Sequence, residues 1–159
     1  MEFKQYLVDT FKFNDTANKK VLEKIKQLPD KTEAIKLFSH LINCQHRWMA
    51  GILQDPQAKK TTWWEPPYEL SELENKWNDS LKLWIDYLNS KTDDELSTEV
   101  IFIGFSGNDF AATPKNIALQ LNYHSIHHRA QIQTIIRQQG LKPDSIEYIN
   151  SNYRELTNK

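Results

Sequence analysis

The stretch Tyr123-His124-Ser125-Ile126-His127-His128-Arg129-Ala130-Gln131 holds three of the five histidines of the chain. It lies inside residues 117–136, which contain no glycine or proline and carry apolar residues at helical spacing. On a helix, His124 and His128 lie one turn apart on the same face, where both imidazoles can reach one metal ion. His127 points elsewhere. The stretch therefore predicts a helix with two metal ligands, and the prediction depends on a third ligand from another element.

Amphipathic segments with apolar spacing near 3.6 extend outward from this stretch. They predict four helices, over residues 2–28, 30–55, 71–89 and 113–139. Residues 55–70 contain three prolines and predict a loop long enough to cross the bundle from end to end. Residues 96–112 are rich in β-prone side chains and predict a small hairpin. The expected fold is all-α: a four-helix bundle with a long crossover after the second helix and a β-hairpin between the third and fourth.

Three helix starts have recognisable capping residues. Asp30 with Glu33, and Ser71 with Glu74, match the spacing of capping pairs. Thr113 before Pro114 predicts an N-cap followed by proline at the first helical position. The short connection after residue 28 predicts an antiparallel hairpin of the first two helices. In that hairpin, His40 lies level with Asn18.

Length and composition narrow the class of protein. With 159 residues, we expect a single domain over 1–159. The net charge of −1, from 20 basic and 21 acidic residues, gives no field that favours nucleic acid or an anionic membrane. One cysteine allows no internal disulfide, and no apolar run approaches the length of a membrane span. We therefore expect a soluble, cytoplasmic protein.

The predicted bundle brings a third histidine toward the first two. His40 lies on the inward edge of the second helix, and metal sites in bundles form from inward side chains of facing helices. His40, His124 and His128 would bind a divalent metal and leave one coordination position open, the pattern of catalytic zinc. Imidazole ligands also suit Ni²⁺ or Fe²⁺. Cys44, one turn after His40, is a pocket candidate, although a single inward cysteine more often packs as a small apolar side chain.

The segment from His124 to Ile132 resembles the His-x-x-x-His-Arg-Gly-Gln signature of the DinB-like superfamily. Leu37-Phe38-Ser39-His40-Leu41-Ile42-Asn43 is similar to the histidine motif in the second helix of that superfamily. Asn18 falls where the first helix of these proteins tends to carry asparagine. Two positions depart from the pattern, since Ala130 replaces the usual glycine and Gln45 stands where many members have glutamate.

The resemblance implies a divalent metal held by three histidines in a four-helix bundle, and often a homodimer. Characterised relatives include bacillithiol S-transferases and mycothiol-dependent maleylpyruvate isomerases. The expected function is therefore transfer of a low-molecular-weight thiol to an electrophilic small molecule. A metal-dependent hydrolase and a non-catalytic, stress-response metal-binding bundle remain alternatives. Asn18, Gln131 and Arg129 are candidates to support the metal ligands. The alternative for Arg129 is a position that faces solvent or a partner subunit.

Overall fold

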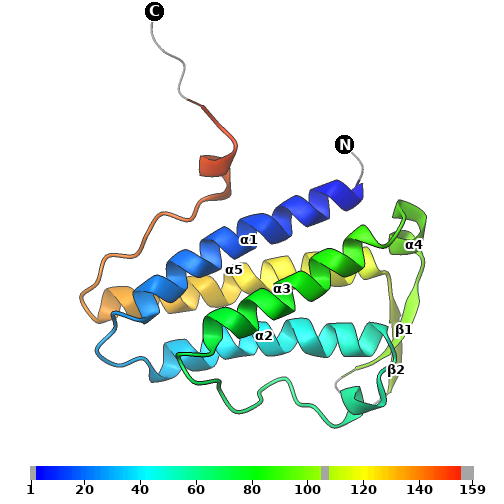
Figure 1. Cartoon of the computed structure of the whole chain (residues 1–159), viewed down its shortest axis with the longest axis horizontal. Coiled ribbons are helices and arrows are strands. Elements are labelled where there is room, and N and C mark those ends of the chain that lie inside the picture. Colours follow the sequence, from blue (N-terminus) through cyan, green and yellow to red (C-terminus); the bar gives the residue numbers. More distant parts are fainter. Residues whose placement is uncertain (1–2, 105–107, 155–159) are drawn as a thin grey trace, which may run out of the picture.

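Helices make up most of the chain in the computed structural model, which describes residues 3–104 and 108–154 (Figure 1). The main helices are α1 (Phe3–Ile25), α2 (Thr32–Ile52), α3 (Leu73–Asn89) and α5 (Pro114–Gln138). The remaining elements are short: η1 (Pro56–Lys59), α4 (Asp93–Ser97), β1 (Val100–Ile103), β2 (Asp109–Ala112) and η2 (Tyr148–Ser151). The predicted all-α bundle is confirmed, as is the hairpin, in which β1 pairs antiparallel with β2 from Val100 opposite Ala112 to Ile103 opposite Asp109.

The four main helices form a bundle in which α1 and α2 lie diagonally. Both helices pack chiefly against α3 and α5, and they make little contact with each other (Figure 1). The first and second helices run antiparallel, as predicted, but the prediction that they are neighbours is wrong. The reason is that α1 ends at Ile25 rather than at residue 28, and the longer connection up to Thr32 reaches across the diagonal of the bundle.

The long crossover between α2 and α3 is confirmed. The chain leaves α2 at one end of the bundle and returns along its side, so that α3 begins at the opposite end (Figure 1). As a result α2 and α3 run parallel, and α5 runs antiparallel to α2 as its neighbour. The crossover thus passes over a flank of α2, where it can cover side chains of that helix.

Helix capping follows the sequence at α5 but not at α3. Thr113 is the N-cap of α5, and its side chain accepts a hydrogen bond from the Asn116 amide, with Pro114 as the first helical residue. The predicted Ser71 cap is wrong, because α3 begins at Leu73 and its N-cap, Glu72, makes no side-chain capping bond.

A second capping prediction is correct only in part. Lys31 is the N-cap of α2 and makes no side-chain capping bond, while Asp30 accepts a hydrogen bond from the Thr32 amide at 3.0 Å. The capping box that does form belongs to α4, a helix that the sequence pattern did not predict. There Thr92 and Glu95 satisfy each other's backbone amides.

The core is built from one connected cluster of buried apolar side chains from α1, α2, α3 and α5. Its largest fully buried members include Trp77, Trp84, Phe11 and Phe38. The Trp84 indole stacks on Phe11 with ring centroids 5.7 Å apart, and its Nε1 donates to the Gln45 carbonyl at 2.9 Å. Trp84 therefore joins α3 to both α1 and α2.

No helix in the described ranges is long and apolar enough to cross a membrane.

A buried polar network joins α1 to α5 on the side away from α2. Arg129 is 3% exposed, and its Nη1 donates to Oδ1 of Asn14 at 2.6 Å and to Oδ1 of Asn18 at 3.3 Å. The same Nη1 donates to Ser125 Oγ at 3.1 Å, and the guanidinium lies over the Phe13 ring. Burial lowers the Arg129 pKa to about 10, which still leaves it charged at neutral pH. These bonds set the rotation of α5, on which His124 and His128 lie.

Replacing Trp84 tests this account of the core. Trp84→Ala should lower the free energy of unfolding by about 3–5 kcal/mol, because it removes a fully buried ring that spans three helices. The matched control is Trp64→Ala, since Trp64 is 50% exposed, and its loss should cost less than about 1 kcal/mol. Urea unfolding followed by circular dichroism measures both. Equal losses would contradict the central place of Trp84.

Candidate metal centre

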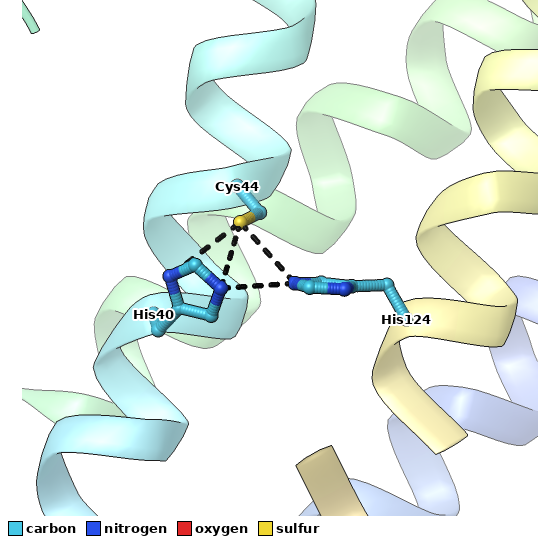
Figure 2. Close-up of side chains that lie close together, drawn as sticks. All are labelled: His40, Cys44 and His124. Carbon is cyan, nitrogen blue, oxygen red and sulfur yellow. Dashed lines mark hydrogen bonds between the residues drawn. The ribbon is translucent and has the colours of Figure 1, made fainter. Parts of the chain in front are cut away.

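Ligand-type side chains from α2 and α5 point toward one another in the bundle (Figure 2). His40 and Cys44 are one turn apart on α2, and His124 faces them from α5. The Nε2 atoms of His40 and His124 are 3.0 Å apart. The Cys44 Sγ lies 3.5 Å from each of these two nitrogens. These three side chains offer ligand atoms that all lie within 4.8 Å of one another.

The His128 ring belongs to the same cluster. Its centroid is 4.8 Å from that of His40 and 4.4 Å from that of His124. The rings of His40 and His124 are 5.0 Å apart. The structure therefore brings the rings of all three predicted histidines together with Cys44, whereas the group of described ligand atoms within 4.8 Å of one another consists of His40, Cys44 and His124 and leaves out His128.

Two of the imidazoles are oriented by hydrogen bonds at their outer nitrogens. Nδ1 of His40 lies 2.7 Å from the carbonyl oxygen of Trp63, and Nδ1 of His128 lies 2.7 Å from Oε1 of Gln131. Since these oxygens only accept, the proton of each neutral ring belongs on Nδ1. Each Nε2 is then left with a lone pair, which is the form that binds a metal.

The distances within the cluster fit a shared ion. Nitrogen and sulfur ligands of one tetrahedral zinc lie about 2.0 Å and about 2.3 Å from it, which places two nitrogens roughly 3.3 Å apart and a nitrogen and a sulfur roughly 3.6 Å apart. The corresponding distances here are 3.0 Å and 3.5 Å. The donor set of His40, His124 and Cys44 therefore matches a divalent metal that accepts imidazole and thiolate ligands.

Burial holds the histidines in the neutral state that a metal requires. Burial, followed by the neighbouring imidazoles of His128, His40 and His127, lowers the His124 pKa to about 4. Burial likewise lowers the pKa of His40 and of His128, although the bonds to Trp63 and Gln131 oppose this shift. At neutral pH no proton has to leave these rings before a cation binds.

The cluster forms one wall of a cavity of about 560 Å³. Trp64 stacks on the His40 ring, with centroids 3.7 Å apart and planes 5° from parallel. The residues that line this cavity come from α2, the crossover and α5: His40, Cys44, Trp48, Trp63, Trp64, Gln120, His124 and His128. The two crossover tryptophans thus contribute to a pocket. Trp48 and Gln120 were not predicted from the sequence as lining residues. The helical repeat could have found both, because Trp48 lies one turn from Cys44 and Gln120 lies one turn from His124.

The other predicted supporting residues divide into two groups. Gln131 contacts a predicted ligand directly, through His128. Asn18 and Arg129 lie in the network between α1 and α5, where Nδ2 of Asn18 donates to Ser125 Oγ at 3.0 Å. The bonds of Asn18 reach α5 rather than His40 because α1 lies diagonal to α2. Asn18 and Arg129 therefore orient the helix that carries His124 and His128 and do not touch the imidazoles through these bonds.

Comparison with known proteins agrees with the geometry. A search of curated proteins found no match. The sequence does match the DinB superfamily over residues 16–132, a range that includes His40, Cys44, His124 and His128. The family match and the buried cluster of histidines and cysteine fit a metal-binding domain. Because the matched range covers most of the chain, the chain belongs to the DinB superfamily.

Proposed function

We propose that the chain transfers a low-molecular-weight thiol to an electrophilic small molecule, using a divalent metal held by His40, His124 and His128. The observation that carries the proposal is the cavity of about 560 Å³ whose wall contains all three imidazoles. Cavities of this size accept small molecules. A divalent ion with an open coordination position binds a thiol as its thiolate, which is the nucleophilic form.

The residues of the chain would orient the reactants and shield them from water. Trp63 fixes the His40 ring through its carbonyl, and Gln131 fixes His128. Trp48, Trp63 and Trp64 supply aromatic surface against which an apolar electrophile can pack. In the reaction, the thiol proton leaves to solvent and the sulfur lone pair forms a bond to the electrophilic carbon. The leaving group departs with the electrons of the bond that breaks.

The composition of the cavity favours thiol transfer over hydrolysis. A metal-dependent hydrolase needs a general base beside the attacking water, most often a carboxylate or a free imidazole. None of the described residues that line the cavity is Asp or Glu, and its three histidines are the proposed ligands. A thiol needs no such base, because its pKa is much closer to neutral than that of water.

Cys44 supports a second candidate function, a non-catalytic metal-binding bundle. Its sulfur lies 3.5 Å from Nε2 of both His40 and His124, within reach of a shared ion. A fourth protein ligand would close the site, as in structural zinc centres. Burial raises the pKa of the Cys44 thiol to about 12, so without a metal it stays protonated. Whether Cys44 coordinates the metal therefore distinguishes the two candidates.

Three further expectations from the sequence stay predictions. A single domain over residues 1–159 is supported by the one apolar cluster that the four main helices share. The cytoplasmic location rests on composition, and the homodimer rests on the family resemblance alone.

Metal content should follow the proposed ligands. His128→Ala should weaken metal affinity by more than about 100-fold, because it removes a proposed ligand. Gln131→Leu only removes the hydrogen bond that orients the His128 ring, and it should weaken metal affinity about 10- to 100-fold. His127→Ala removes a neighbouring exposed histidine and should leave the affinity unchanged. Elemental analysis and competition with a chromophoric chelator measure these affinities. Wild-type affinity in His128→Ala would exclude His128 as a ligand.

Activity should depend on both the metal and an added thiol. With 1-chloro-2,4-dinitrobenzene as a model electrophile and a panel of low-molecular-weight thiols, the metal-loaded protein should form the thioether above the uncatalysed rate. His124→Ala should abolish this excess rate, while His127→Ala should keep it. If the metal-loaded wild-type protein gave no excess rate with any thiol, thiol transfer would be rejected.

Cobalt substitution should show whether Cys44 closes the site. With Co²⁺ bound through the three histidines, the protein should show no thiolate-to-cobalt charge-transfer band until a thiol is added. The band should then appear in wild type and in Cys44→Ser alike. A band that is present before any thiol is added, and absent from Cys44→Ser, would instead identify the closed, non-catalytic centre.

A further inference from the structure

A second cavity, of about 510 Å³, lies on another face of α2. His40, Cys44 and Trp48 line the first cavity, and the helical repeat turns Asn43 and Arg47 toward this second cavity. Residues of the crossover, from Asp55 to Tyr68, cover it. Its volume is in the range of small-molecule sites.

Two residues that line this cavity each carry a buried hydrogen-bond donor with no partner among the described residues. Asn43 and Arg47 are each 7% exposed. Nδ2 of Asn43 and Nε of Arg47 are buried without a hydrogen bond to any described residue. The Asn43 amide is held in place because its Oδ1 accepts from the Tyr68 hydroxyl at 2.7 Å. An unpaired buried donor costs about 1–3 kcal/mol, so two of them in one cavity indicate a ligand that supplies acceptors.

The charge of Arg47 is also unmatched in the described part of the chain. Its guanidinium packs on the face of Trp63, 5.4 Å from the ring centroid, and no described ion pair includes it. A buried cation is stable when an anion or several acceptors surround it. A carboxylate meets this need with the planar geometry that guanidinium prefers.

Acidic groups of the cavity lie nearer to solvent than these donors. Asp55 is exposed, and Glu65 is half-buried with Oε1 accepting from the Thr62 amide. The apolar side chains of Met49 and Leu83 also line the cavity. The cavity therefore offers donors in its buried part, apolar side chains on its wall and negative charge near its exterior.

We propose that this cavity binds a small zwitterion of the amino-acid class, with an apolar side chain. The carboxylate would accept from Asn43 and Arg47, and the ammonium group would face Asp55 and Glu65. The side chain would pack on Met49 and Leu83. The proposal does not rest on the metal centre, since only Trp63, whose ring meets Arg47 and also lines the other cavity, is common to both arguments.

Isothermal titration calorimetry of the full chain with L-leucine and L-methionine tests the proposal. At least one of them should bind saturably. L-leucinamide, which lacks the carboxylate, and 4-methylpentanoate, which lacks the ammonium group, should each bind at least about tenfold more weakly than L-leucine, a difference of roughly 1.4 kcal/mol. Absence of saturable binding by both amino acids would overturn the proposal, as would binding of either analogue as tight as that of L-leucine.

A pair of arginine variants locates the site. Arg47→Met keeps much of the side-chain length and should weaken binding at least about tenfold. Arg137→Met, at an exposed position in the last turn of α5, should bind as wild type does. If Arg47→Met does not fold, the NMR signal of the Arg47 Nε–H group in the wild-type protein replaces it as the readout. That signal should shift on titration, and a signal that stays in place while the amino acid binds would overturn the assignment to this cavity.

Discussion

The imidazoles of His40, His124 and His128 lie 4.4 to 5.0 Å apart, centroid to centroid, because α2 and α5 pack as antiparallel neighbours. This contact is the constraint on which the candidate centre depends. A small rotation of either helix would separate the rings beyond the reach of one ion. Arg129 opposes such a rotation of α5, since it is hydrogen-bonded to Asn14 and Asn18 of α1. The buried network thus supports the position of the candidate metal centre and does not contact its side chains through these bonds.

The crossover has more than a connecting role. The Trp63 carbonyl orients His40, while its ring meets Arg47 on the other face of α2. Trp64 stacks directly on the His40 ring. One irregular segment thereby completes two cavities, which agrees with the tendency of long loops on a rigid scaffold to carry function. It also explains how a bundle with a dense apolar core can still offer space for small molecules.

Local patterns predicted much of the fold. The four long helices, the hairpin and the Thr113 cap of α5 follow from periodicity and capping chemistry, both of which act over a few residues. Helix ends were less predictable: the Ser71 cap did not form, and α4 with its Thr92 capping box was not expected. Such ends depend on how the chain enters the bundle. Several capping residues in one segment compete, and tertiary contacts select between them.

The sequence by itself determined that His124 and His128 share one face of a helix and that His40 and Cys44 share one face of another, because the helical repeat sets both spacings. Only the tertiary structure decided which faces meet. The sequence pattern predicted that α1 and α2 are neighbours and that Asn18 lies beside His40. In the packed bundle α1 and α2 lie diagonally, and Asn18 is hydrogen-bonded to Ser125 of α5. The physical reason is that periodicity specifies which side of a helix is apolar. The length of a connection and the fit of the whole core decide which helix covers that side.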